Sequence, residues 1–346
     1  MTDSNRTTRS RRIAGAIRLA ALTAMLTAAV LATAACTQVK ETASGASAKI
    51  DQWLGTGSGE ASSVEADADR LYQDGLGARA RGAEADAFAN FLAAAESGHD
   101  AAAFEVGLAY RDGRGIAEDL EASAQWINRA ADRGEPRAQY LVGLAYYSGT
   151  GVARDYAHAV TFLTAAAIQG HAEAQLLLGR AFANGRGVAK DRAWAARWYG
   201  KAAAQGLREA QFTYGVVRAA GLGLPKNSRR GYAWLLLAAR AGHPKAGAVA
   251  AALAKKLTPE RLAKATAQAD RFEPVADPPF ADPATVMYLE HVLNSLGFEA
   301  GPVDGILGKR SRAAISRYQK SRSLPTSGTA TPELVQRLFE EQNPGA

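Results

Sequence analysis

Apolar side chains in the middle of the chain recur at the three- and four-residue spacing of an amphipathic helix. Two such stripes follow one another: Ala138, Leu141, Val142, Ala145 and Tyr146, then Ala159, Phe162, Leu163, Ala166 and Ala167. Residues at these spacings share one face of a helix, so each stripe predicts a helix with one buried side. Gly149 and Gly151 tolerate positive φ and predict a sharp turn between the helices. Asp155 predicts the N-cap of the second helix, since its carboxylate accepts hydrogen bonds from free N–H groups.

This helical pair repeats every 36 residues in four copies that align without a gap. The recurring positions are Gly107, Gly143, Gly179 and Gly215; Gly113, Gly149, Gly185 and Gly221; Asp119, Asp155, Asp191 and Asn227; and Gly134, Gly170, Gly206 and Gly242. A fixed period of this length is typical of a solenoid, in which each unit buries its apolar face against its neighbours. The glycine within the first helix predicts a close approach of the two helices in each pair.

Degenerate copies of the repeat flank the four clear units. Residues 66–98 keep part of the glycine spacing, and Ala246 lies 36 residues after Ala210. Terminal units of a solenoid are expected to be atypical because one face meets water. We therefore predict an all-α solenoid over residues 64–271.

A second pattern follows a proline-rich segment at 272–285, which predicts a stiff linker. Residues 286–342 carry three short apolar stripes, with a compact turn segment at 301–308 after the first. A chain of this size supports only a minimal core, so we expect a three-helix module. His291 falls outside the apolar stripe of its helix, and we expect it to be exposed.

The four clear units share the pattern A-x-x-x-L-G-x-x-Y-x-x-G-x-G-V-x-x-D-x-x-x-A-x-x-W-x-x-x-A-A-x-x-G. This pattern resembles Sel1-like repeats, a tetratricopeptide-related α/α family. The resemblance implies an α/α superhelical solenoid that binds a protein or peptide on its concave face. The identity of that partner does not follow from the sequence.

The C-terminal module resembles the small three-helix peptidoglycan-binding domain of cell-wall hydrolases and envelope proteins. The resemblance rests on Leu296-Gly297-Phe298, Val303-Asp304-Gly305, Ser311, Ala314, Ile315, Tyr318 and Gln319. It implies peptidoglycan as the ligand. Together with the basic run described below, it gives these candidate contacts: Asp304, Gly305, Arg310, Arg312, Tyr318 and Gln319.

Two of these assignments have a structural alternative. Asp304 and Gly305 are typical turn-formers as well as possible ligands. Between Lys309 and Arg322 there are six basic residues and no acid. Such a face either meets the carboxylates of stem peptides or other anionic polymers, or is an ordinary solvated surface.

The first 35 residues are predicted to be a signal peptide. Five Arg and one Asp stand in residues 1–18, and residues 19–35 carry no charge. A basic segment before a short, Ala-rich apolar stretch is typical of secretion, and the stretch is marginal for a spanning helix. Ser10-Arg11-Arg12 leaves twin-arginine export as an alternative.

Cys36 is the only cysteine and follows this stretch directly. Residues 33–36 resemble a bacterial lipobox, so we expect the Cys36 thiol to be lipidated and residues 36–63 to form a flexible tether. Thr37 at the next position favours the outer membrane by the same resemblance. Ordinary signal-peptidase cleavage, which leaves a soluble periplasmic protein, is the alternative.

Composition excludes several functions. Without residues 1–35 the basic residues fall from 41 to 36 and the acidic from 34 to 33, so the net charge falls from +7 to +3. We therefore expect no nucleic-acid partner. A single cysteine gives no thiolate metal site, and no nucleotide or hydrolase motif is present, so we expect no cofactor and no catalysis. His99, His171 and His243 share one junction position roughly 20 Å apart, too far to share a metal.

The sequence thus predicts a non-enzymatic protein of the bacterial cell envelope, in the periplasm and anchored to the outer membrane as a lipoprotein. It would bind peptidoglycan through residues 286–342 and recruit a protein on the solenoid. The alternatives are a regulator or auxiliary component of a cell-wall hydrolase or synthase, a cryptic wall hydrolase, or a secreted solenoid that acts on host proteins.

Overall fold

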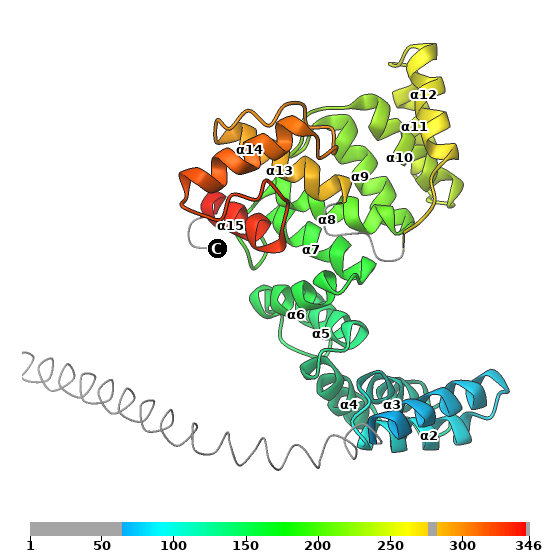
Figure 1. The fold of residues 1–346 in the computed structure, drawn as a ribbon. Helices are drawn as coiled ribbons and strands as arrows, with labels where there is room; N and C mark the ends of the chain where they lie inside the picture. Colours follow the sequence, from blue (N-terminus) through cyan, green and yellow to red (C-terminus); the bar gives the residue numbers. More distant parts are fainter. Residues whose placement is uncertain (1–63, 276–281, 344–346) are drawn as a thin grey trace, which may run out of the picture. The chain divides into compact units, whose positions relative to one another are not determined.

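The computed structural model describes residues 64–275 and 282–343. Within these ranges all regular structure is helical, which confirms the predicted all-α class (Figure 1). The predicted signal peptide (1–35), the Cys36 lipidation site and the tether (36–63) lie outside the described residues.

A helix over residues 64–80 precedes a series of paired helices (Figure 1). Consecutive helices pack against one another over residues 84–254, and the helix over 259–270 packs on the one over 228–240. Their bounds are α2 (Glu84–Glu96), α3 (Asp100–Asp112), α4 (Leu120–Asp132), α5 (Pro136–Ser148), α6 (Tyr156–Ile168), α7 (Ala172–Asn184), α8 (Arg192–Ala204), α9 (Arg208–Ala220), α10 (Ser228–Arg240), α11 (Ala246–Ala254) and α12 (Pro259–Asp270). The helices from α3 to α10 all have 13 residues, so the repeat of the sequence is also a repeat of the structure.

The second unit, α5 and α6, shows how the repeat sequence sets local structure. Gly149 follows α5 with a φ of 76°, a left-handed conformation that glycine adopts without strain. The Asp155 carboxylate caps α6 through two backbone hydrogen bonds of 2.9 and 3.0 Å. A Cβ on Gly143 would lie 2.9 Å from Leu163 Cγ, so the absent side chain allows the pair to pack closely.

The C-terminal module has the three predicted helices: α13 (Pro283–Ser295), α14 (Lys309–Ser321) and α15 (Pro332–Gln342). Its core side chains are at most 1% exposed, and they are Tyr288, Leu289, Leu293, Ile315, Tyr318 and Leu338. The buried residues of the module and those of the solenoid form one continuous hydrophobic core. The module therefore does not stand apart from the repeats.

Helix α13 packs against α8 of the third unit, and residues 68–346 form one compact unit. Lys201 Nζ lies 2.6 Å from Asp282 Oδ2, with both side chains less than a tenth exposed. Arg197 Nε donates to Thr285 Oγ1 over 3.1 Å. Asp282 and Thr285 fall in the predicted linker, yet both are buried where the module meets the solenoid.

Aromatic rings fill the rest of this interface. Trp194 of α8 lies 4.8 Å from Tyr288 and 4.5 Å from Phe339, measured between ring centroids. Phe182 of α7 meets Phe339 edge-on at 5.4 Å. Such pairs stabilise an interface beyond the apolar area that they bury.

Among the four units, the third alone has a tryptophan, an arginine, a glycine and a lysine at the α8 positions that pack against α13. The second unit has different residues at these positions, 36 residues earlier: His158, Thr161, Thr164 and Ala165 in place of Trp194, Arg197, Gly200 and Lys201. A Cβ on Gly200 would lie 2.5 Å from Ala284 Cβ, so the close approach of α13 requires a glycine there.

The prediction that His291 is exposed is wrong. Its side chain is half-buried and lines a cleft with Asp191 and Asn343. Burial lowers the pKa of the His291 imidazole. Helical phase placed His291 off the module's own core, but that side of α13 faces the solenoid.

Candidate functional site

The six candidate peptidoglycan contacts lie in three different settings. Asp304 and Gly305 belong to a turn beside α13, and Arg310 and Arg312 are exposed on α14. Tyr318 and Gln319 are buried on the same helix. The structure therefore does not bring the six side chains together on one surface.

The turn at Asp304 and Gly305 is held from within the module. Glu290, which is 1% exposed, accepts hydrogen bonds of 3.0 Å from both backbone N–H groups. Its other carboxylate oxygen accepts from Ser311 Oγ over 2.8 Å. Burial raises the pKa of Glu290, while these donors oppose that effect.

The same turn also faces the solenoid. Arg230 of α10 donates to the Asp304 carbonyl oxygen, and the Asp304 carboxylate accepts from Ile306 N over 2.8 Å. Gly305 has a φ of 78°, and a Cβ there would lie 2.7 Å from the carbonyl oxygen of Pro283. Both residues thus form the turn, as the turn-former alternative predicts, and the Asp304 carbonyl also contacts the repeats.

Tyr318 and Gln319 direct their polar atoms into the module. The Tyr318 hydroxyl donates to Glu341 over 2.9 Å, and burial raises the pKa of Tyr318 to about 12. Gln319 Oε1 accepts from the backbone N–H groups of Ser327 and Gly328 at 3.0 and 2.9 Å. Gln319 thus holds the turn at residues 327–328 and Tyr318 joins α14 to α15, so the side-chain polar atoms of both are already hydrogen-bonded.

Arg310 and Arg312 remain as exposed candidates in a basic surface on α14. Lys309, Arg310, Arg312 and Lys320 are exposed, and no hydrogen bond or ion pair joins their side chains to another described residue. Unpaired cations on one helix create a positive field that attracts anionic polymers.

A groove of about 690 Å³ lies beside this basic surface. Its lining residues are Asn294, Glu299, Gly301, Lys309, Arg310, Ala313 and Arg317. Asn294 bonds to the backbone of Ala300 and Gly301 at 2.7 and 2.8 Å and fixes one wall. The groove thus presents three cationic side chains together with one amide, backbone groups and the carboxylate of Glu299.

Sequence reasoning missed part of this groove. Lys309 and Arg317 were counted only as part of the basic run, and Asn294 and Glu299 were not considered. The seven-residue spacing of Arg310 and Arg317 places them on one helical face and was available as a signal. The contribution of Asn294 arises from tertiary contact and had no signal in the sequence.

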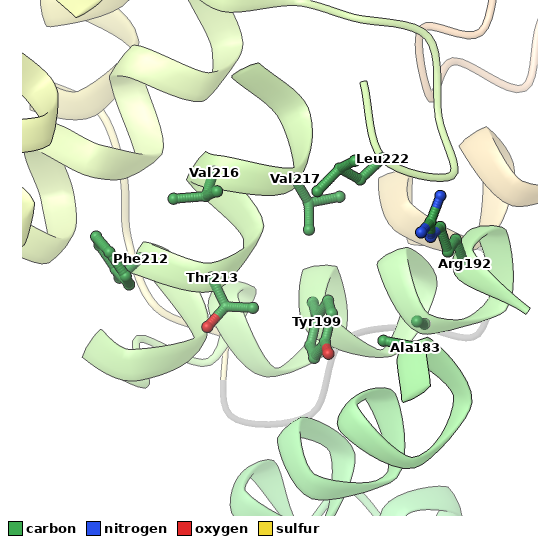
Figure 2. Close-up of a pocket in the computed structure, with 9 residues that line it drawn as sticks. Ala183, Arg192, Tyr199, Phe212, Thr213, Val216, Val217 and Leu222 are labelled. Carbon is green, nitrogen blue, oxygen red and sulfur yellow. The ribbon is translucent and has the colours of Figure 1, made fainter. Parts of the chain in front are cut away.

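A pocket of about 320 Å³ lies within the repeats, between α7, α8 and α9 (Figure 2). Its walls are mainly apolar: Ala183, Ala195, Tyr199, Phe212, Thr213, Val216, Val217 and Leu222, with Arg192 at one side. Figure 2 shows Tyr199 between Ala183 and Thr213, with Val217 and Leu222 above it. Sequence reasoning assigned a partner to the solenoid but named no residue for it.

The three junction histidines accept backbone hydrogen bonds, and two of them, His99 and His171, cap helices. Nδ1 of His99 accepts from Ala102 N at 3.1 Å, and Nδ1 of His171 accepts from Ala174 N at 3.3 Å. His243 Nδ1 accepts from Lys245 N over 3.3 Å. In residues 64–275 and 282–343, no group of three His, Cys, Asp or Glu side chains is placed to hold a metal ion.

Two family models match the chain. The model described as "Sel1 repeat" matches residues 100–135, 136–171, 172–207 and 208–243, which confirms the four units and their 36-residue step. The model described as "Putative peptidoglycan binding domain" matches residues 283–338.

Curated relatives cover only short parts of the chain. Identity is 48% over 52 residues to the "Putative OxPP cycle protein OpcA" of Nostoc punctiforme, which is 15% of this chain and 11% of the relative. It is 33% over 112 residues to the "Localization factor PodJL" of Caulobacter vibrioides, which is 30% of this chain and 12% of the relative. The chain thus spans about a tenth of the length of these relatives.

Solved structures support the repeat fold. A Sel1 repeat protein from Oxalobacter formigenes is 28% identical with a TM-score of 0.50, over 60% of this chain and 88% of that protein. A protective antigen of uropathogenic Escherichia coli strains, which displays an SLR fold, is 23% identical with a TM-score of 0.51, over 85% of this chain and 63% of that protein. Among the described helices, none is long and apolar enough to cross a membrane.

Proposed function

Because the chain is a Sel1-repeat protein with a C-terminal domain of the peptidoglycan-binding family, we propose that it is a non-enzymatic scaffold of the cell envelope. The module would hold peptidoglycan, and the repeats would recruit a protein partner. Both families are binding modules, which supports a scaffold. A zymogram on wall material in which the chain clears a band would contradict the non-enzymatic part.

One observation supports this function best: the module is packed on α8 while its basic surface on α14 stays exposed. Lys309, Arg310 and Arg312 are not among the residues that contact the solenoid, whereas Asp304 and Met287 are. A wall ligand can therefore bind α14 without separating the module from the repeats.

The ligand chemistry follows from the groove beside α14. Lys309, Arg310 and Arg317 supply cationic donors, and Arg guanidinium groups suit carboxylates because they donate two parallel hydrogen bonds. The carboxylates of stem peptides are the anionic groups of peptidoglycan that such a groove would hold. We therefore assign the groove, which Arg310 lines, to the stem peptide, with the exposed Arg312 on the same helix.

Co-sedimentation with purified peptidoglycan tests this assignment in the chain without its first 35 residues. We expect this chain to pellet, and the double variant Lys309→Glu/Arg310→Glu to bind about tenfold more weakly, equivalent to ~1.4 kcal/mol. The intact chain is needed because a fragment that carries only the module would expose Tyr288 and Phe339, which pack on α8.

The matched control is Lys255→Glu/Lys256→Glu, an equal charge reversal at two exposed neighbouring lysines near the end of α11. It should pellet like the parent chain. Equal binding by all three proteins would remove the α14 surface from the site, and failure of the parent chain to pellet would refute the wall ligand itself.

We also propose that Cys36 carries a lipid that anchors the scaffold to the outer membrane. The lipobox-like residues before it support this assignment. Metabolic labelling with a palmitate analogue should mark the parent chain and not Cys36→Ser. An unlabelled parent chain recovered from the soluble periplasm would favour ordinary cleavage.

A further inference from the structure

The pocket between the third and fourth units has a counterpart one repeat earlier that is filled by the protein itself. There Tyr147 and Tyr156 pack edge-on at 5.2 Å between ring centroids. The guanidinium of Arg186, from the next loop, lies 5.7 and 5.4 Å from the two centroids and hydrogen-bonds the Tyr147 hydroxyl at 3.3 Å. Two aromatic rings and a cation therefore close the junction of the second and third units.

The residues 36 positions later are Ala183, Arg192 and Leu222. Ala183 takes the place of Tyr147, so a phenol ring is missing from the junction of the third and fourth units. Arg192 occupies the repeat position that is equivalent to Tyr156, and Leu222 occupies the one that is equivalent to Arg186. All three line the open pocket (Figure 2).

The loop that carries Leu222 keeps its position despite these changes. A Cβ on Gly223 would lie 2.1 Å from the Arg192 carbonyl oxygen, as one on Gly187 would lie 2.1 Å from that of Tyr156. Each loop therefore contacts the first residue of the second helix in the preceding unit. The pocket thus arises from side-chain replacement at one junction and not from a displaced loop.

We propose that this pocket binds an aromatic side chain of a partner protein, which takes the place of the ring that Ala183 lacks. The inference rests on the proposed role of the repeats as a recruiting surface. Leu222 and Val216 supply apolar walls, and the exposed Arg192 supplies a cation for the face of the ring. A Leu or Val side chain would gain the apolar contact without the cation–π term.

Tyr199 adds a polar contact at the pocket. Its side chain is 5% exposed and its hydroxyl makes no hydrogen bond to another described residue. Burial raises the pKa of Tyr199 to about 12, so the hydroxyl stays protonated and can donate to the bound segment.

The test uses N-acetyl-L-tyrosinamide and N-acetyl-L-leucinamide as probes of the chain without its first 35 residues, with binding followed by saturation-transfer NMR. We expect the tyrosinamide to bind and Ala183→Tyr to weaken that binding at least about tenfold. Tyrosine occupies the equivalent position of the second unit, so the substitution suits the repeat. Arg192→Gln should weaken the tyrosinamide a few-fold and leave the leucinamide unchanged.

Arg111→Tyr is the matched control, because it places the same ring at the same repeat position of the first unit. It should bind the probe like the parent chain. In the opposite direction, Tyr147→Ala should open the closed junction and raise the number of tyrosinamide sites from one to two.

Three results would overturn the inference: equal binding of the two probes, undiminished binding by Ala183→Tyr in a variant with the parent's circular dichroism, or a concentration-dependent dimer that Ala183→Tyr abolishes. The last would assign the pocket to a second copy of this chain. Peptidoglycan pelleting of Ala183→Tyr is measured alongside and should be unchanged, so failure at the pocket is separable from failure of wall binding.

Discussion

At the scale of single residues, the junction histidines of this solenoid accept backbone hydrogen bonds, and His99 and His171 cap helices. His99, His171 and His243 accept a backbone hydrogen bond through Nδ1 and stack on Tyr72, Tyr140 and Phe212 at 4.1–4.6 Å between ring centroids. The cap requires an unprotonated Nδ1, because a protonated nitrogen donates and cannot accept.

We predict that His171 makes the folded chain less stable in acid. Burial lowers its pKa, and the charge of Arg137 lowers it further, while the nearby carboxylates of Glu173 and Glu135 oppose these effects. The unfolded chain then binds a proton before the folded chain does, so this stability is complete above about pH 6.5 and is lost as the pH falls below it. Tm should fall between pH 7.5 and 5.5.

The variant His171→Asn isolates this effect, since Asn keeps an acceptor for the cap but does not titrate. Its fall in Tm over the same pH range should be smaller than that of the parent chain. His291 has its pKa lowered in the same direction and leaves part of the dependence in place. An identical pH dependence in both proteins would show that His171 does not contribute.

At the scale of elements, the packing of α13 against α8 fixes how the module contacts the repeats. The Asp282 carboxylate caps α13 through bonds of 2.8 and 3.0 Å to Ala284 N and Thr285 N, and it also pairs with Lys201 of α8. Nearby, burial lowers the pKa of Arg197 to about 10, so its guanidinium stays charged between Trp194 and Trp198 at neutral pH. The same carboxylate thus begins the module and attaches it to the repeats.

Removal of one partner of this buried pair should be costly. Lys201→Met leaves the Asp282 charge buried without its counter-ion, and we expect unfolding in urea to lose about 3 kcal/mol. Adding Asp282→Asn should recover part of that loss. Arg129→Met, at the same repeat position in the first unit but exposed, should cost less than about 1 kcal/mol. Similar losses for Lys201→Met and Arg129→Met would refute the role of the buried pair.

At the scale of the whole molecule, the third unit serves both as a repeat and as the platform for the C-terminal module. Its helix α8 carries Trp194, Arg197, Gly200 and Lys201 toward α13, while the other side of α8 contributes Tyr199 to the repeat pocket. The C-terminal module and the repeat pocket are therefore attached to the same helix.

A single substitution should separate the module from this platform. Leucine occupies the Gly200 position in the fourth unit, as Leu236, so Gly200→Leu suits a repeat helix but collides with Ala284. We expect trypsin to cut between the solenoid and the module faster than in the parent chain, and tryptophan emission to shift to the red. Asn128→Leu, at the same position on the exposed face of α4, should change neither. Unchanged proteolysis in Gly200→Leu would contradict the packing of α13 on α8.

The sequence by itself determined the repeat, its helices and their ends. The 36-residue step can be read directly from the sequence. The glycine that follows each first helix and the caps such as Asp155 are local features, because each acts on residues within a turn or two of itself. Similarity to two families then supplied the fold of each part. The six candidate contacts were chosen by the same resemblance, and only their placement in the fold shows that Arg310 and Arg312 face solvent.

Only the tertiary structure decided how these parts combine. Lys201 and Asp282 are 81 residues apart, and nothing in the repeat pattern marks the third unit as the one that receives the module. The pocket at Ala183 likewise exists because residues from three helices and a loop meet around a missing ring. Periodicity reports which face of a helix is buried, whereas the partner of that face depends on contacts distant in sequence.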